Sequence, residues 1–380
     1  MSISDAASFF QQGTALNNEL APAYIITIDG DDISNKIRNR LISMGIVDNR
    51  GFEADTIEIQ LDDSDGLLSL PRRGAKLRAF IGWSGSALTD KGVYTVDEIE
   101  YSGAPDVVTV RGKSVDLRDK MQVQKECSYH QKTLKDIVGS IAGTHSLIPV
   151  ISNTIASELL DHIDQQCESD ASFLTRLAKQ YDAIATVKDG RLLFIKMGLG
   201  LTASGAKMQP IVISRKSGDN HRFSVADREA YTGVVANWHD HASAKKKSIK
   251  VRRKKKTTQQ ATDTTPSNVK VNATDKNLLV GTDENVKVLR HLYASKTNAQ
   301  RAALAEWQRL QRGVAEFSIT LAKGQPELIP ELPVSVSGYK PEIDAAGWII
   351  TRASHQLDDG GYTSSIELEV MLDEIPESEE

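Results

Sequence analysis

Residues 167–195 read CESDASFLTRLAKQYDAIATVKDGRLLFI, and this stretch carries the clearest structural signal in the chain. Ser169 and Asp170 come directly before apolar residues at helical spacing, and Lys179 follows late in the same run. A serine or aspartate at this point favours the start of a helix, and a late lysine suits its negative end. The dipeptide Asp189-Gly190 then separates two apolar runs, which indicates a β-hairpin. The stretch therefore predicts a helix capped by Ser169 or Asp170 and followed by a hairpin.

The residues before this stretch also follow a helical period. Leu134, Ile137, Val138 and Ile141 recur at the spacing of one helix face. Together with the helix and hairpin just described, they predict a small α/β unit over residues 126–205.

Strand-like patterns flank this unit on both sides. In Thr56–Leu61 the apolar side chains alternate at period two, as on a half-buried strand. Several such runs, separated by turn residues, suggest a barrel or sandwich. The predicted fold class is therefore a mixed, β-rich α+β protein with one β module over 23–125 and a second over 206–241 and 286–375. The other candidate strands are Ala23–Asp29, Lys76–Trp83, Val93–Tyr101, Val107–Arg111, Ile211–Ser214, Phe223–Val225, Tyr231–His239, Ala315–Leu321 and Ser364–Leu372.

Two features interrupt the second β module. Asn298–Arg312 has the pattern of an amphipathic helix, with Gly313 at its end. Residues 242–285 are highly polar and cannot bury much surface, so we expect an extended loop there. The remaining residues, 1–22 and 376–380, form an N-terminal segment and a short tail.

The polar stretch begins with a basic run that has nine Lys or Arg among twelve residues. Such a run could grip phosphates, but it lacks the interleaved aromatic residues that stack on bases. A solvated loop, or one that meets an acidic partner surface, is therefore favoured over a nucleic-acid site. The cationic residues are Lys245, Lys246, Lys247, Lys250, Arg252, Arg253, Lys254, Lys255 and Lys256.

The composition is that of an ordinary globular protein, with 40% hydrophobic and 26% charged residues. The net charge of -5 provides no overall attraction to nucleic acid or anionic lipid. The chain contains no stretch of about 18 apolar residues, so no membrane span is predicted. The first residues lack the pattern of a secretory signal. Cys127 and Cys167 are the only cysteines, and we expect both thiols to be buried in a protein of a reducing compartment.

Catalytic and metal-binding motifs are absent or incomplete. Gly200–Lys207 resembles a phosphate loop, but Ala206 separates the second glycine from the lysine. Gly82–Ser86 lacks the final glycine of a nucleophile elbow, and His239 and His241 have no third metal ligand nearby in sequence. We therefore predict no catalytic residue, no metal site and no cofactor, although carboxylates far apart in sequence could still converge.

The order Glu-Ser-Asp, Phe-Leu, Arg-Leu-Ala, Tyr and Asp-Gly in residues 167–195 resembles a signature of the phage late control D proteins. These are the baseplate hub proteins of contractile tails in P2-like and Mu-like phages, and the hub portion of type VI secretion spike proteins is similar. The strands at 23–28 and 232–239 and the hairpin at 360–372 also resemble parts of that family, so the resemblance covers about 22–372. The motif residues are Glu168, Ser169, Asp170, Phe173, Leu174, Arg176, Leu177, Tyr181, Asp189 and Gly190.

The resemblance implies two tube-type β-barrel domains joined through α/β inserts. Three subunits would form a ring that joins the sixfold tail tube to the threefold central spike. The implied partners are other copies of the chain, the spike, the tail tube, baseplate wedge proteins and the tape measure protein. DNA would only pass through the lumen, so the basic run should face the outer wall. The protein would reside in the virion tail baseplate, and in the host cytoplasm during assembly, without stable membrane insertion.

The motif residues would have a structural role in such a hub. Ser169 or Asp170 would cap the helix, and Phe173, Leu174 and Leu177 would seat it on a barrel. Two alternatives remain from the sequence alone. One is a cell-wall-degrading tail hydrolase, and the other is a DNA-binding regulator that uses the basic run.

Overall fold

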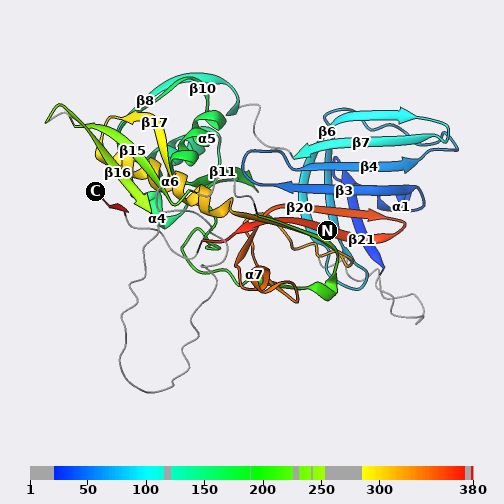
Figure 1. Cartoon of the computed structure of the whole chain (residues 1–380). Helices are drawn as coiled ribbons and strands as arrows, with labels where there is room; N and C mark the ends of the chain where they lie inside the picture. Colours follow the sequence, from blue (N-terminus) through cyan, green and yellow to red (C-terminus); the bar gives the residue numbers. More distant parts are fainter. Residues whose placement is uncertain are drawn as a thin grey trace, which may run out of the picture.

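The structure, a computed structural model, describes residues 21–114, 121–188, 190–225, 231–240, 243–252, 285–372 and 378–379. Strands dominate these residues and form four sheets, of 13, two, three and four strands (Figure 1). The first strands, β1 (Pro22–Ile28) and β2 (Asp31–Asp32), belong to the large sheet, whereas the last strand, β22 (Ser378–Glu379), belongs to the four-stranded sheet at another part of the molecule (Figure 1). The predicted β-rich, mixed α+β class is confirmed.

The N-terminal half of the large sheet follows the predicted alternation closely. In β4, Ile57, Ile59 and Leu61 are buried and the residues between them are not. Their side chains pack in one core with buried residues of the neighbouring strands. The elements of this half are β1 (Pro22–Ile28), β2 (Asp31–Asp32), α1 (Ser34–Ile37), β3 (Leu41–Asn49), β4 (Thr56–Asp62), β5 (Lys76–Trp83), β6 (Thr89–Ser102) and β7 (Val107–Ser114).

The C-terminal half of the large sheet has a core of its own. Trp348, Phe317 and Ile366 are buried there, and the Phe317 and Trp348 ring centroids lie 5.4 Å apart. Large aromatic side chains supply much of the apolar area that such a core buries. The elements are β13 (Ile211–Ser214), η2 (Arg215–Ser217), β14 (Gly218–Val225), β18 (Ala315–Leu321), β19 (Pro333–Ser337), α7 (Pro341–Asp344), β20 (Trp348–Asp358) and β21 (Gly361–Val370).

The two halves are joined edge to edge, which corrects the expectation of two closed barrels. β20 pairs antiparallel with β3 over seven residue pairs, from Arg352 opposite Asn49 to Asp358 opposite Ser43. Across the described residues the strand order β14-β18-β21-β20-β3-β4-β7-β6-β5-β1-β2 is therefore an open path. The edge of β3 pairs with the edge of β20, so neither edge is available to close its own half into a barrel.

A separate core with helices and short strands lies between the two halves in sequence. A two-stranded sheet joins β8 to β10, and a three-stranded sheet joins β11, β12 and β9, with β12 and β9 parallel. Phe173, Leu174 and Leu177 are fully buried in this core. They seat α5 on the strands of its own unit, which corrects the expectation that they would seat it on a barrel. The elements are β8 (Gln124–Thr133), α3 (Leu134–Thr144), β9 (Ile148–Ile151), α4 (Asn153–Ala156), β10 (Leu159–Ser169), α5 (Asp170–Tyr181), β11 (Ala183–Lys188) and β12 (Arg191–Lys196).

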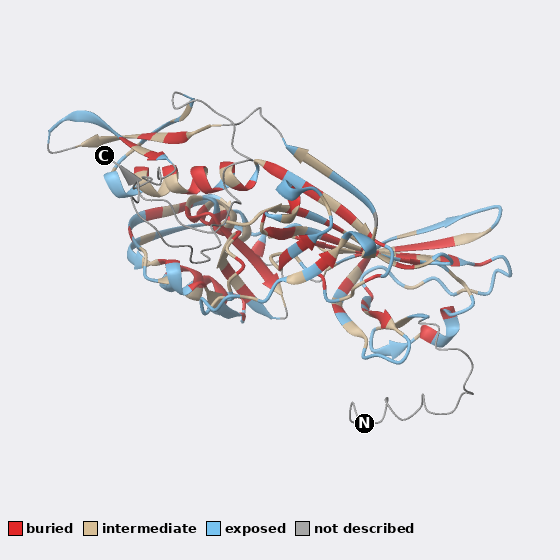
Figure 2. Ribbon diagram, turned by 60° about the horizontal axis from the view of Figure 1, so that its bottom comes forward, coloured by how far each residue is buried: buried red, intermediate tan, exposed pale blue. Residues whose placement is uncertain are grey.

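A fourth unit was not predicted. β15 (Gly233–Asp240), β16 (Lys245–Arg252), β17 (Val286–Tyr293) and β22 (Ser378–Glu379) form a sheet that packs on α6 (Lys296–Arg312). The sequence pattern places β15, β17 and α6 in the second β module. They separate from it because their apolar residues face one another and share one core. Figure 2 shows the hairpins at the two ends of the molecule as largely exposed, whereas buried positions gather in its centre.

The expected basic loop is in part a strand, which corrects the prediction for Lys245–Arg252. In β16, Ile249 and Val251 are buried against α6, while the residues between and before them are not buried. The run Ser-Ile-Lys-Val-Arg thus alternates at the period of a strand, and the high charge of the segment hid this alternation. The rest of the polar stretch that was expected to be a loop, 253–284, lies outside the described residues, and so do 241–242.

Candidate functional site

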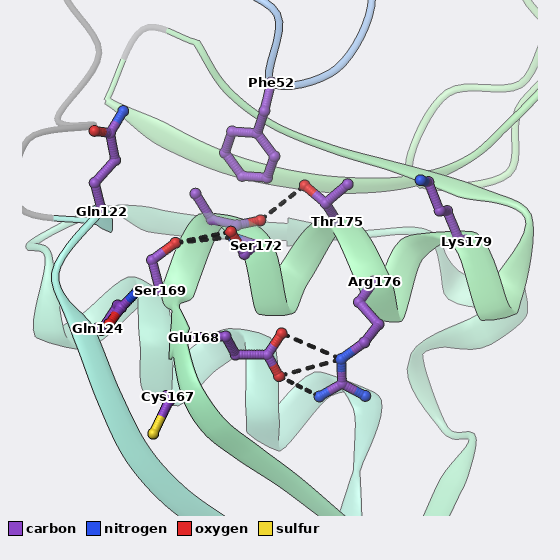
Figure 3. Close-up of a pocket in the computed structure, with 11 residues that line it drawn as sticks. Phe52, Gln122, Gln124, Cys167, Glu168, Ser169, Ser172, Thr175, Arg176 and Lys179 are labelled. Atoms are coloured by element: carbon purple, nitrogen blue, oxygen red, sulfur yellow. Dashed lines mark hydrogen bonds and ion pairs between the residues drawn. The ribbon is translucent and has the colours of Figure 1, made fainter.

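An open groove lies at the first turns of α5, within the motif that resembles a known family. Its volume is about 740 Å³. Phe52 from the β3–β4 connection closes one side, and the end of β10 and the exposed side of α5 form the others (Figure 3). The lining residues are Phe52, Gln122, Gln124, Cys167, Glu168, Ser169, Ala171, Ser172, Thr175, Arg176 and Lys179.

Ser169 is the residue that caps α5. Its Oγ accepts a hydrogen bond from the Ser172 backbone N at 3.2 Å, and its own backbone is extended, as an N-cap requires. The helix ends at Tyr181, after which Asp182 adopts the left-handed conformation with φ 49°. The open choice between Ser169 and Asp170 is therefore settled for Ser169.

Asp170 instead holds three segments of the α/β unit together. Its carboxylate is fully buried and lies 2.6 Å from Lys125 Nζ and 2.6 Å from His145 Nε2, and it accepts a hydrogen bond from Gln165 Nε2 at 3.0 Å. Burial alone would raise the pKa of Asp170, but the hydrogen bonds from these three partners outweigh it and lower that pKa below its ordinary value. The charged carboxylate therefore stabilises the contacts between β8, α3, β10 and α5.

Glu168 and Arg176 form an ion pair on the wall of the groove (Figure 3). Arg176 Nε lies 3.1 and 3.2 Å from the two carboxylate oxygens, and Arg176 Nη2 donates to the Asp164 carbonyl at 2.7 Å. The guanidinium also lies 5.2 Å from the centre of the Phe173 ring. Because these contacts occupy Arg176, the groove offers polar contacts without a free cationic site at this residue.

The groove also lacks an activated nucleophile among the residues that line it. The thiol of Cys167 donates to Glu126 Oε1 at 3.3 Å, and this carboxylate raises the pKa of the thiol. Cys127 and Cys167 are both exposed, so the prediction of two buried thiols is wrong. They lie on the two-stranded β8–β10 sheet, where Cys167 sits at a bulge with φ 48°.

The remaining motif residues support the helix and the hairpin. Tyr181 is buried at the end of α5, and the Arg301 guanidinium of α6 lies 4.5 Å from the centre of its ring. β11 and β12 pair antiparallel over six residue pairs, which confirms the hairpin. Gly190 adopts φ 70°, as a tight turn of this kind requires. Asp189 lies outside the described residues.

A cluster of buried and partly buried charges joins all four units, and it was not predicted from the sequence. Arg312 of α6 donates to both carboxylate oxygens of Asp182, and its Nε lies 3.3 Å from Glu369 Oε1 in β21. Arg50, which follows β3, lies 2.6 Å from Glu369 and 2.7 Å from Glu331. No local pattern could reveal this cluster, because its members come from distant parts of the chain.

A second buried cluster lies where the two halves of the large sheet meet. Lys91 Nζ lies 2.9 Å from Asp48 Oδ2 and donates to the Leu328 carbonyl at 3.3 Å. His355 Nε2 lies 3.8 Å from the same aspartate oxygen. Asp48 comes from β3, Lys91 from β6 and His355 from β20, so the cluster links β3 and β6 to β20 across the joint.

In the described part of the basic run, one lysine forms an ion pair with a neighbouring strand. Lys247 Nζ lies 2.6 Å from Asp240 Oδ2 and 5.4 Å from the centre of the Trp238 ring. Within the described residues, no acidic side chain lies in ion-pair contact with Lys245, Lys246 or Lys250. Arg252, at the end of β16, has an interaction partner. Arg253, Lys254, Lys255 and Lys256 lie outside the described residues.

Histidines that seemed scattered in the sequence meet in one place. His130 and His162 face each other across β8 and β10, with their Nδ1 atoms 3.0 Å apart, and Asp164 lies 2.9 Å from His162 Nε2. Among the described residues, no group of three or more His, Cys, Asp or Glu could hold a metal ion. In the same residues, none of the helices has the length and apolar content needed to cross a membrane.

Comparison with solved structures shows where this fold recurs. A tail protein from Neisseria meningitidis MC58 matches with a TM-score of 0.64 at 12% identity, over 93% of this chain and 98% of that one. The 43 kDa tail protein of prophage MuSo2 from Shewanella oneidensis matches with a TM-score of 0.60 at 14% identity, over 92% and 98%. An E. coli component of the type VI secretion system matches with a TM-score of 0.51 at 11% identity, over 90% and 76%. At these identities the likeness concerns the fold alone.

Comparison of sequences gives closer relatives. The chain is 44% identical over 368 residues to the "Probable baseplate hub protein" of Escherichia phage 186, covering 94% of this chain and 95% of that protein. It is 45% identical over 378 residues to the protein of the same description from Escherichia phage P2, again covering 94% and 95%. The family model described as phage tail baseplate hub (GPD) matches residues 56–361. These matches confirm the resemblance noted in the sequence, and the chain belongs to the phage tail baseplate hub (GPD) family.

Proposed function

We propose that this chain is the hub subunit that joins the sixfold tail tube to the threefold central spike, as a ring of three copies. The observation that carries the proposal is the β3–β20 joint, which places two β modules with separate cores side by side in one subunit. Three such subunits would present six similar modules to the sixfold tube. The same ring has threefold symmetry overall, which matches the spike. Each half of the large sheet would then act as a tube-type module.

The free ends of the large sheet support a ring. Among the described residues, β14 pairs on one side only, with β18, and at the opposite end β1 is covered beyond β5 by the two residues of β2. A ring needs two different surfaces on each subunit that fit one another, and open sheet edges at opposite ends meet that need. We propose that these two ends face each other between neighbouring copies.

The motif groove would have a structural role in this setting. Asp170, Ser169 and the Glu168–Arg176 pair hold α5 against its own unit through hydrogen bonds and ion pairs that are already complete. We propose that the basic strand lies on the outer wall, toward wedge proteins, while DNA only passes through the lumen. The tail tube and the tape measure protein would be the partners on the other side. Assembly would take place in the host cytoplasm before the hub enters the virion baseplate.

The test is the oligomeric state of the purified chain, alone and with its spike protein, by mass photometry and electron microscopy. The expected particle with the spike contains three copies in a ring of six similar modules. A complex with one or two copies per spike, or a ring in which the β14 and β1–β2 ends point away from neighbouring copies, would refute the proposal. The family assignment describes a structural tail protein, so the hydrolase and the regulator are not proposed.

A further inference from the structure

The outer edge of β16 is open along most of its length. In the four-stranded sheet the order is β17-β15-β16-β22, so β16 has β15 on one side. On the other side, β22 pairs with it at only two positions, Lys250 opposite Glu379 and Val251 opposite Ser378. Within the described residues, the backbone from Lys245 to Ile249 therefore has no strand partner on this edge. Figure 1 shows the last strand, in red, beside β16 at the end of the molecule.

The side chains along this edge are cationic and available. Lys245 and Lys246 are exposed and Lys250 is partly exposed, and within the described residues none of the three has an ion-pair partner. Lysines on an edge strand discourage pairing with another neutral or basic strand, because the charges would be buried or opposed. They favour an added strand of the opposite charge, since charges on adjacent strands interact across the ladder.

The chain itself supplies the example of such a strand. Residues 373–380 read DEIPESEE, with five carboxylates and no cation, and Ser378–Glu379 of this segment is the part that pairs with β16. Charge on the edge alone would not identify a partner. The strand found on the edge comes from an acidic segment, which is an independent observation and points to the chemistry of the partner.

We infer that the outer edge of β16 is a docking site for an extended acidic segment of another baseplate protein, which adds a strand and displaces β22. Backbone hydrogen bonds along Lys245–Ile249 would provide affinity, as in other cases of strand addition, and the lysines would select acidic sequences. The acidic residues at the end of the chain then compete for the same edge and weaken binding. Only the identity of the partner as a baseplate protein rests on the proposed function.

The probe is a fluorescein-labelled peptide of residues 371–380, and the readout is fluorescence anisotropy with the full chain. Reversal of the edge charge by K245E, K246E and K250E should weaken binding about tenfold or more. The matched control reverses three exposed lysines elsewhere, K132E, K135E and K216E, and should leave binding unchanged. Circular dichroism and thermal midpoints equal to those of the wild type establish that each variant is folded.

Two further measurements separate strand addition from charge attraction. A peptide of the same sequence with alternate N-methylated amides keeps its charge but cannot pair as a strand, and it should bind at least tenfold more weakly. A full chain with a neutralised end (D373N, E374Q, E377Q, E379Q and E380Q) should bind the peptide more tightly than the wild type, because its own segment competes less.

Three outcomes would overturn the inference. Equal binding of the methylated and unmethylated peptides would mean that the peptide is held by charge attraction alone and adds no strand. An equal loss of peptide binding in the control variant would mean that the β16 edge has no specific role in binding. Tighter binding of a single-stranded oligonucleotide than of the peptide, abolished by K245E, K246E and K250E, would make the edge a phosphate-binding site. None of these outcomes affects the ring, which is measured separately by the oligomeric state of the same variants with the spike.

Discussion

The pH dependence of folding should show that His355 stays neutral where the two halves of the large sheet meet. Its side chain is 1% exposed. Ser364 Oγ and Tyr362 Oη lie 2.9 and 3.0 Å from Nδ1. Burial is the main cause that lowers the pKa of His355 to about 3, the Lys91 ammonium adds to it, and the Asp48 carboxylate opposes it.

The size of the effect follows from the difference between the folded and unfolded states. In the unfolded chain the pKa of a histidine is about 6.5, so between pH 6.5 and 3 the unfolded state binds one proton more than the folded state. The stability from neutral His355 is therefore fully present above pH 6.5 and is lost as the pH falls. Each pH unit below 6.5 removes about 1.4 kcal/mol from the free energy of unfolding, or about 2 kcal/mol between pH 7 and pH 5.

The assay compares denaturant unfolding of the wild type with that of His355→Gln at pH 7 and pH 5. The variant loses the titrating ring, so its stability should fall by about 2 kcal/mol less than that of the wild type over this range. The control His291→Gln removes an exposed histidine and should keep the wild-type pH dependence. Equal losses in the wild type and His355→Gln would refute the reasoning. The ring proton signal that disappears in His355→Gln should also not shift in wild-type NMR spectra between pH 7 and pH 5.

Three further predictions concern the buried charges and the cap of α5. Arg312→Met leaves the buried Asp182 without its bidentate cation and should lower the free energy of unfolding by about 3–5 kcal/mol, whereas Arg309→Met on the exposed side of α6 should cost about 0.5 kcal/mol or less in the same denaturation assay. Ser169→Ala should lower it by about 1 kcal/mol, and Ser169→Asp should restore most of the loss, because either oxygen-bearing side chain can accept from the Ser172 amide. Asp170→Asn should destabilise the chain at pH 7. Because the folded-state pKa of Asp170 is lowered, the gap to the wild type should narrow as the pH falls below about 3.8 and this carboxyl takes up its proton; a gap that stays constant down to pH 2 would contradict this assignment.

Elements whose interacting residues lie close together in the chain are predictable from the sequence, whereas contacts between distant segments are not. α5 and the hairpin after it were predicted because Ser169, Phe173, Leu177 and Gly190 act on neighbours within a few turns or strand positions. The fold class and the strands of the large sheet are predictable for the same reason, because the alternation of apolar residues within each strand is local. The role of Asp170 was missed, since a helix start is also a place for an aspartate cap and its real partners come from three separate segments.

The failures concern choices that local patterns do not encode. Whether β3 closes its own half or pairs with β20 depends on which free edge lies nearer in the folded chain, and both outcomes have the same alternating sequence. β16 was hidden for a different reason. Its charge count indicated a loop, although Ile249 and Val251 carried the period of a strand. For charged segments of this kind, the spacing of the few apolar residues is more informative than the overall polarity.

In the proposed ring, which would connect two symmetries, the buried charges would have a further role. A subunit of that ring would need a fixed angle between its two β halves, since a change in that angle would shift every module. Buried ion pairs add little net stability compared with apolar packing, but an unpaired buried charge is costly, so they tolerate few alternative arrangements. Arg50 of the N-terminal half and Arg312 of α6 bind carboxylates from the C-terminal half and from the α/β unit. The Asp48–Lys91–His355 cluster lies at the joint itself. These ions therefore select one arrangement of the four units, and their loss should impair ring assembly more than it impairs the fold of either half.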